Sequence, residues 1–345
     1  MFQLPTAAKT LQRNKRQEKV CYSKMDQNSE FLPVKRQKPS AVDGIKTQHY
    51  KQTPIPGKAP KKILPEGTAL ILEGGGTRGF YSAGVFDAFV DAGIMFPYII
   101  GVSAGAANAL SYISGQKGRN RQIVEKYVGN PKYVSKRNLL FHRSLFGMEF
   151  VFHEVPQKHI FIDWEMFNKQ NINFLTGAFN CETGQTVWFN KSDITPSLDA
   201  VMASCSVPLL SSIFKYQGLK LLDGGIAAPI PIEKSISDGN TFHVIVLTRN
   251  QGYQKNAFKY EFVLKMIYKK FPKLIETILN RHDIYNRQLA LCEQLEKEGK
   301  AVIIRPKKPL QVKESYDRNI KKLLELCDEG YDEAKEIIEM LLQRF

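Results

Sequence analysis

From about residue 66 onward, short apolar runs alternate with segments in which apolar residues recur at helical spacing. The apolar runs predict strands at 68–73, 97–101, 173–180, 186–189, 219–223, 242–248 and 301–305. The other segments predict helices at 78–92, 104–115, 119–128, around 196–204, at 229–237 and, with breaks, at 257–298. Strands that alternate with helices in this way are typical of a wound α/β sheet.

The C-terminal segment, 317–345, has apolar positions at helical spacing on both sides of Gly330. This pattern predicts two amphipathic helices that dock on the domain, and a partner-binding helix is the alternative. We therefore expect three parts: a basic segment at 1–62, an α/β core at 66–250, and C-terminal helices with one further strand at 251–345.

Charge is concentrated in the N-terminal segment. The chain carries a net charge of +15, and residues 1–62 contribute +10 of it through 14 Lys or Arg against 4 Asp or Glu. The segment is rich in proline and poor in periodic apolar residues, which predicts disorder. It could contact an anionic membrane or serve as a solubilising tether, and a transit peptide is a third alternative. No nucleic-acid-binding motif accompanies the charge, so we expect no nucleic-acid partner.

Composition limits the size of the domain and the kinds of site and segment that we expect. The 345 residues, 43% of them hydrophobic, can form one large α/β domain with additions. Five scattered cysteines without a CxxC pair indicate reduced thiols and no zinc site, and we expect no metal or cofactor. The sequence shows neither a transmembrane run nor a secretory signal, which favours a cytoplasmic or peripherally membrane-associated protein. It identifies no protein partner.

A Gly-x-Ser-x-Gly pentapeptide, GVSAG, occupies residues 101–105. It follows an apolar run and precedes a helix of small residues, which is the strand-turn-helix context of a nucleophile elbow. In such an elbow, Gly101 and Gly105 would let the backbone turn sharply and present the hydroxyl of Ser103. The alternative is an ordinary Gly/Ala-rich turn, so further motifs must decide between them.

A glycine-rich loop, GGGTRG, occupies residues 74–79 between a predicted strand and a helix. Bare amides at a helix N-terminus attract negative charge. The GxGxxG spacing also fits a dinucleotide site, but such a site needs an acidic residue at the end of the second strand, and that strand runs into the serine elbow. We therefore predict an oxyanion hole formed by Gly74, Gly75, Gly76, Thr77, Arg78 and Gly79.

Asp223 ends a short apolar strand and is followed by two glycines, Gly224 and Gly225. By itself this DGG sequence could be a plain turn. In the company of GGGTRG and GVSAG, it makes Asp223 the candidate partner of Ser103.

Together these motifs resemble the patatin-like phospholipases, in particular bacterial members with a long helical C-terminus. The resemblance rests on GGGTRG at 74–79, GVSAG at 101–105, the ASCSVP block at 203–208 and DGG at 223–225, in the family's order, and it covers roughly residues 66–345. Glu73 and Cys205 are local departures. The resemblance implies a three-layer α/β/α fold with a mostly parallel central sheet and a helical C-terminal extension.

The resemblance also implies a serine-dependent lipid acyl hydrolase of the phospholipase A or lysophospholipase type. Ser103 would be the nucleophile, Asp223 would accept its proton, and the amides of Gly75, Gly76 and Thr77 would bind the oxyanion. The substrate would be a phospholipid or lysophospholipid. One alternative is a Ser-Asp-His triad that uses His243 or His282. Another is a lipid-binding protein that keeps the fold without turnover.

An aromatic-rich stretch at 138–152 lies between the elbow and the third predicted strand. It could form a mobile cap with an apolar wall for an acyl chain, or its aromatics could pack as ordinary core.

Overall fold

The computed structural model describes residues 55–312 and 316–345. Of the predicted basic segment 1–62, residues 1–54 therefore lie outside the described residues. Its last residues are described and lie against the domain. The amides of Lys58 and Lys61 donate to the carbonyls of Gly115 and Gly93. Strand β1 (Lys62–Ile63) then pairs in parallel with β3 (Ile94–Met95).

Eight strands of the described residues form one sheet: β2 (Thr68–Leu72), β4 (Tyr98–Gly101), β5 (Asn173–Asn180), β6 (Thr186–Asn190), β7 (Phe214–Tyr216), β8 (Leu219–Asp223), β9 (Phe242–Val246) and β10 (Ala301–Ile304). Their order is β10-β9-β2-β4-β5-β8-β7, and β6 pairs with β5. The strands from β10 to β5 are parallel, whereas β6 and β8 run antiparallel to β5. The predicted, mostly parallel sheet is confirmed.

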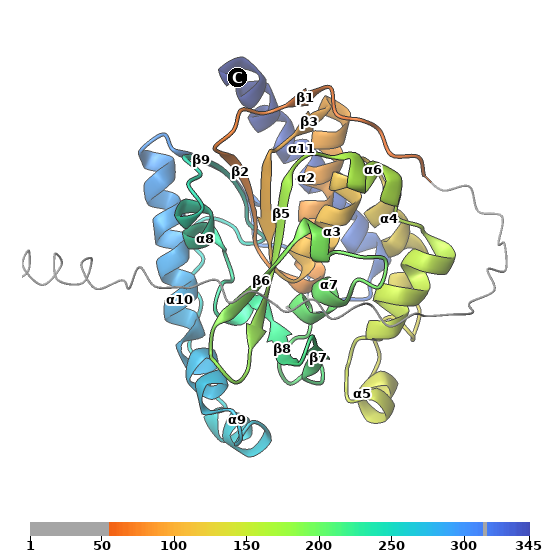
Figure 1. The fold of residues 1–345 in the computed structure, drawn as a ribbon, viewed down its shortest axis with the longest axis vertical. Helices are drawn as coiled ribbons and strands as arrows, with labels where there is room; N and C mark the ends of the chain where they lie inside the picture. Colours follow the sequence, from red (N-terminus) through yellow and green to blue (C-terminus); the bar gives the residue numbers. More distant parts are fainter. Residues whose placement is uncertain (1–54, 313–315) are drawn as a thin grey trace, which may run out of the picture. The chain divides into compact units, whose positions relative to one another are not determined.

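Helices cover both faces of this sheet (Figure 1). Strand β2 is apolar from Ala69 to Leu72 because its side chains alternate between two cores: Leu70 and Leu72 face one, Ala69 and Ile71 the other. The first core includes residues of α2 (Gly79–Ala92), α3 (Ala104–Ile113) and α11 (Ile320–Arg344). The second includes residues of α8 (Ile232–Ser237) and α10 (Pro272–Lys297). The result is the three-layer α/β/α architecture.

The connections carry shorter helices: α4 (Arg119–Ile123), α5 (Lys136–His142), α6 (Trp164–Lys169), α7 (Asp199–Ser204) and α9 (Glu261–Ile267). The predicted helix 119–128 changes to π-helix after α4, in η2 (Val124–Val128), and a second π-helix, η3, spans Phe150–His159. The aromatic stretch 138–152 is divided. Leu140 and Phe141 are exposed on α5, whereas Phe150 and Phe152 are buried.

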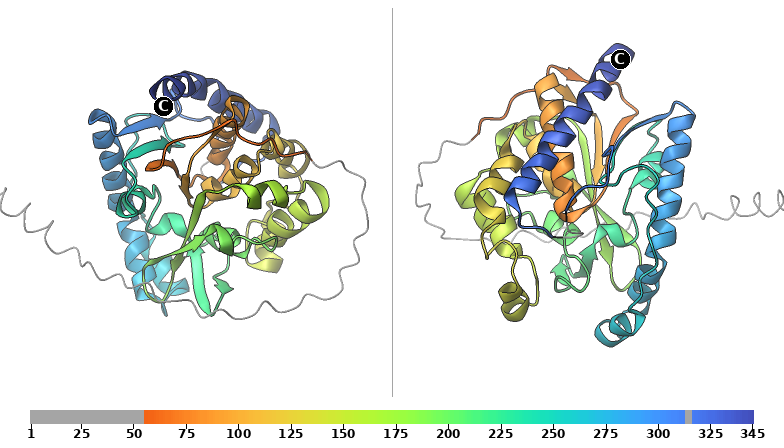
Figure 2. Two further views of the ribbon diagram at one scale, coloured as in Figure 1. Left: turned by 45° about the horizontal axis from the view of Figure 1, so that its top comes forward. Right: turned by 180° about the vertical axis from the view of Figure 1, so that it is seen from behind.

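The prediction of two C-terminal helices interrupted at Gly330 is wrong, because α11 is one continuous helix of 25 residues. Gly330 lies where α11 crosses α2. A Cβ on Gly330 would come within 2.0 Å of the Tyr81 carbonyl oxygen, and one on Gly84 within 1.8 Å of the Cys327 carbonyl oxygen. The two glycines permit close approach of the helices instead of ending one of them. Figure 2 shows α11 lying along α2 from behind.

Candidate active site

Strand β5 brings the ends of β4 and β8 together. Gly101, the last residue of β4, pairs with Thr176, and Asp223, the last residue of β8, pairs with Ala178. Both partners lie on the edge of β5 opposite β6, and β4 and β8 run toward each other along that edge. Their carboxyl ends therefore meet beside Gly177. The serine elbow that follows β4 and the aspartate that ends β8 are neighbours for this reason.

Ser103 occupies a strained position at the turn between β4 and α3. Its φ of 54° and ψ of −133° lie where a residue with a side chain is rarely found, at a cost of about 1–3 kcal/mol. Its amide donates a 2.9 Å hydrogen bond to the hydroxyl of Ser204. The turn also packs tightly, because a Cβ on Gly105 would come within 2.7 Å of the Glu73 carbonyl oxygen. These contacts fix the elbow, and the Ser103 side chain is 7% exposed.

The Asp223 carboxylate is buried beside the serine. Oδ1 accepts a 2.7 Å hydrogen bond from the Gly225 amide. Burial raises the pKa of the Asp223 carboxyl above its ordinary value; hydrogen bonds from the Ser103 hydroxyl and the Gly225 amide, and the charge of Arg281, offset part of that rise. A carboxylate with a raised pKa is a stronger base than a solvated one, which suits it to accept a serine proton.

The Ala-Ser block at 203–208 holds both residues in place. Ser204 accepts the hydrogen bond from the Ser103 amide, and the Ser206 carbonyl accepts a 2.8 Å hydrogen bond from the amide of Asp223. In the sequence, this block contributes only to the resemblance. Its contacts with Ser103 and Asp223 depend on chain folding and have no local sequence signal.

The glycine-rich loop packs directly on the elbow. A Cβ on Gly74 would come within 3.1 Å of the Cβ of Ser103, and one on Gly79 within 2.8 Å of the Cβ of Ala104. The amides of Gly74, Arg78 and Gly79 donate to backbone carbonyls. For the amides of Gly75, Gly76 and Thr77, we find no acceptor among the described residues. Gly76 and Thr77 line the same cavity as Ser103.

A charged network lies behind this loop. The buried Glu73 carboxylate accepts hydrogen bonds from the amide and hydroxyl of Thr248 and from the Tyr285 hydroxyl, the last at 3.0 Å. Burial lowers the pKa of Arg78, and so does the nearby Arg249. Arg281 donates from Nε to the Gly225 carbonyl at 2.5 Å. Glu73 and Arg281 thus support the loop and the Asp223 turn, and sequence analysis did not foresee either role.

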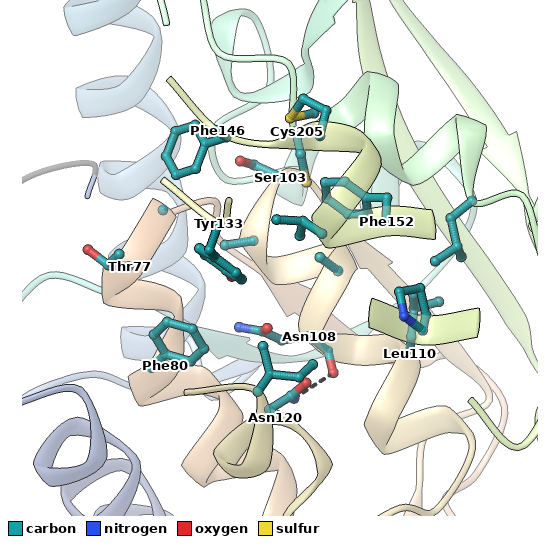
Figure 3. A pocket seen from close by; sticks show the side chains of 18 of the residues that line it. Thr77, Phe80, Ser103, Asn108, Leu110, Asn120, Tyr133, Phe146, Phe152 and Cys205 are labelled. Atoms are coloured by element: carbon teal, nitrogen blue, oxygen red, sulfur yellow. Dashed lines mark hydrogen bonds between the residues drawn. The ribbon is translucent and has the colours of Figure 1, made fainter. Parts of the chain in front are cut away.

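An apolar cavity of about 130 Å³ opens beside Ser103 (Figure 3). In the figure, Ser103 and Cys205 lie together at one end of the lining side chains, with Phe146 and Phe152 on either side and Asn120 at the far end. Burial raises the pKa of the Cys205 thiol well above its ordinary value, so this neighbour of Ser103 stays protonated. The aromatic stretch contributes to the cavity wall through the half-buried Phe146 and the buried Phe152.

Neither candidate histidine of a triad has contacts at the dyad. His243 lies in β9 opposite Ala69, near the start of the strands, and its Nδ1 is 3.3 Å from the hydroxyl of Ser235. Burial lowers the pKa of His243 to about 4. His282, on α10, contacts the Leu279 carbonyl and Asp283.

Within residues 55–312 and 316–345, no three His, Cys, Asp or Glu side chains gather as metal ligands would. None of the helices in these ranges combines the length and apolar character needed to cross a bilayer.

The structure is a three-layer α/β/α fold in which a serine elbow lies next to a buried strand-end aspartate and against a glycine-rich loop. Serine acyl hydrolases are built on arrangements of this kind.

Comparison with known proteins places the chain more narrowly. Residues 70–235 match the family model described as patatin-like phospholipase, and residues 271–345 match a domain of unknown function, DUF6363. Residues 70–235, just under half of the chain, thus form a patatin-like phospholipase domain.

Similar curated proteins include the uncharacterized protein YjjU of Escherichia coli, 25% identical over 202 residues and matched over 54% of either chain. Lysophospholipase NTE1 of Scheffersomyces stipitis is 28% identical over 187 residues, which is 52% of this chain and 12% of that protein. The chain thus spans about half the length of the first relative and far less of the second. Among solved structures, VipD from Legionella pneumophila aligns with a TM-score of 0.37 and 12% identity over 80% of this chain and 67% of that chain.

Proposed function

We propose that the protein is a lipid acyl hydrolase of the phospholipase A or lysophospholipase type, with Ser103 as nucleophile and Asp223 as base. The observation that carries the proposal is the strained Ser103 elbow beside a buried carboxylate whose pKa is raised, at the mouth of an apolar cavity. The patatin-like phospholipase domain at 70–235 and the similarity to lysophospholipase NTE1 support a lipid substrate.

The reaction begins when the Ser103 oxygen attacks the acyl carbonyl while its proton moves to Asp223. The tetrahedral oxyanion accepts hydrogen bonds from the amides of Gly75, Gly76 and Thr77. One such donor contributes about 3–4 kcal/mol to transition-state stabilisation in other acyl-transfer enzymes. The ester C–O bond then breaks, and Asp223 returns the proton to the departing alcohol. Water attacks the acyl-enzyme, again through Asp223, and releases the fatty acid.

The cavity beside Ser103 supports the choice of a lipid as the class of substrate. Its wall beside Ser103 is apolar, formed by side chains such as Phe80, Phe146 and Phe152, and an acyl chain in it would bury apolar surface. The departing alcohol would be a lysophospholipid or a glycerophosphoalcohol. Contact of residues 1–62 with an anionic membrane stays a prediction, because residues 1–54 lie outside the described part of the chain.

Fatty-acid release from phosphatidylcholine and from lysophosphatidylcholine tests the proposal. We expect the purified full chain to release fatty acid from at least one of the two. Ser103→Ala should abolish release, and Ser237→Ala, which alters an exposed serine, should retain it. Release that survives in Ser103→Ala would contradict the assignment. Lipid binding without release by the wild type would instead favour a non-catalytic lipid-binding protein.

A further inference from the structure

Exposed large apolar side chains cluster on two short helices. Of the twelve such side chains in the described residues, seven lie on α5 or on α9 and the residue before it. On α5, Leu140 is 76% exposed and Phe141 67% exposed. On α9, Phe262 is 69% exposed and Met266 68% exposed. Single exposed apolar residues are ordinary on a protein surface, but clusters of them mark interaction sites.

Both helices project from the same end of the described domain (Figures 1 and 2). Strands β1 and β3, which lie near the start of the parallel strands, are at the opposite end in Figure 1. The carboxyl ends of β2 and β4, where the glycine-rich loop and the Ser103 elbow begin, therefore point toward the end that carries α5 and α9. The apolar side chains lie on the side of the molecule that a substrate must approach.

Positive charge surrounds these apolar side chains. From residue 255 to residue 273 there are six lysines against one acidic residue, Glu261, which pairs with Lys265 at 2.6 Å. From residue 132 to residue 143 there are four basic residues and no acidic one. The exposed cations on or next to the two helices are Lys136, Arg137, Arg143, Lys259, Lys265, Lys269, Lys270 and Lys273.

We propose that α5 and α9 form a docking surface for an anionic lipid bilayer. Basic side chains around exposed aromatic and aliphatic ones suit the phosphate and acyl layers of such a bilayer at once. Docking by this surface would turn the carboxyl ends of β2 and β4, where the glycine-rich loop and the Ser103 elbow begin, toward the lipid. Its use in catalysis rests on the proposed lipid hydrolase function, whereas the docking itself does not.

Vesicle flotation of the full chain tests this surface. All proteins carry Ser103→Ala, so that the vesicles stay intact, and they are mixed with vesicles of phosphatidylcholine alone or of phosphatidylcholine with phosphatidylserine. We expect binding to the phosphatidylserine vesicles that weakens with added salt. The changes Phe141→Ser, Phe262→Ser and Met266→Ser together should reduce it by about tenfold or more.

Met340→Ser with Leu342→Ser provides the matched control, because both side chains are exposed on α11, away from the proposed surface. We expect this variant to bind as the parent does. Undiminished binding of the triple variant, or an equal loss in the control, would overturn the proposal.

A second readout separates this proposal from the catalytic one. With Ser103 intact, the triple variant should hydrolyse a soluble short-chain ester at the wild-type rate and lose activity only on vesicles. If the soluble ester is hydrolysed by neither protein while flotation follows the pattern above, the lipid hydrolase function fails and the docking surface stands. A parallel loss of soluble-ester activity in the triple variant alone would contradict a purely interfacial role.

Discussion

At the scale of single residues, the site depends on contacts that hold two groups in unfavourable states. Ser103 keeps a backbone conformation that costs free energy, and Asp223 keeps a carboxylate away from water. The Ser204 hydroxyl accepts a hydrogen bond from the Ser103 amide, and the Gly225 amide donates one to the Asp223 carboxylate. These two hydrogen bonds hold Ser103 and Asp223 in place. Strain and desolvation of this kind persist only where the surrounding structure enforces them.

The pH dependence of hydrolysis should report the raised pKa of Asp223. Activity requires the deprotonated carboxylate, so it should fall as the pH falls through a pKa above the ordinary value of about 3.9. Arg281 lowers this pKa through its charge, and Arg281→Gln should therefore move the acid limb of kcat/KM to higher pH. The measurement is the rate of soluble-ester hydrolysis against pH.

Arg281→Lys is the matched control, because it keeps the charge and should leave the acid limb closer to its wild-type position. An acid limb at or below about pH 4, or one that Arg281→Gln does not move, would contradict this account of the base.

Sequence motifs point to the two residues that we propose carry the chemistry, but not to the residues that hold them in place. Ser103 and Asp223 stand in short local patterns that a reader of the sequence can find. Glu73, Ser204 and Arg281 act through partners far away in the chain: Glu73 contacts Thr248, Ser204 contacts Ser103, and Arg281 contacts Gly225. Contacts between residues so far apart in the chain leave no periodic or local signal in the sequence.

At the scale of elements, the strands β2, β4, β9 and β10 were predictable because they consist almost entirely of apolar residues. Strands β1, β3 and β7 have only two or three residues each, too few for a pattern. Gly330 shows a different limit. A glycine within a helical pattern can end the helix or can serve a close contact, and the sequence around Gly330 fits both. In the structure, Gly330 serves a close contact with α2, and the helix continues through it.

Substitution of Gly330 by alanine tests this crossing. In an isolated helix the change would stabilise by about 1 kcal/mol, because alanine is the better helix former. Here the new Cβ would meet the Tyr81 carbonyl, so we expect a loss of about 2–3 kcal/mol in the free energy of unfolding. Urea denaturation measures the change, with Gln343→Ala at an exposed position of α11 as control. Stabilisation by Gly330→Ala would show that the helices do not meet there.

At the scale of the whole molecule, the fold class and the parallel core were predictable, and the antiparallel direction of β8 was not. The α/β alternation predicted a wound sheet, and the structure has one. Placement of Asp223 beside Ser103 depends on β8 running antiparallel to β5, which the length of the apolar run 219–223 does not indicate. The chain direction of a short strand follows from the connection that precedes it and from the packing around it.

Positive charge is distributed unevenly over the whole molecule. The sequence locates +10 of the net +15 in residues 1–62, and that excess makes contact with an anionic membrane one of the alternatives for this segment. The folded domain adds a second basic region on α5 and α9, which is visible only once the exposed apolar side chains between the cations are known.

The most direct test of the central claim is the rate at which a fluorophosphonate probe labels the protein. We expect a covalent adduct on Ser103 in the wild type and none in Ser103→Ala. We also expect Asp223→Asn, which keeps the shape but loses the base, to label at least about 100-fold more slowly while its melting temperature stays near that of the wild type. Labelling at another residue, or an unchanged rate in Asp223→Asn, would contradict it.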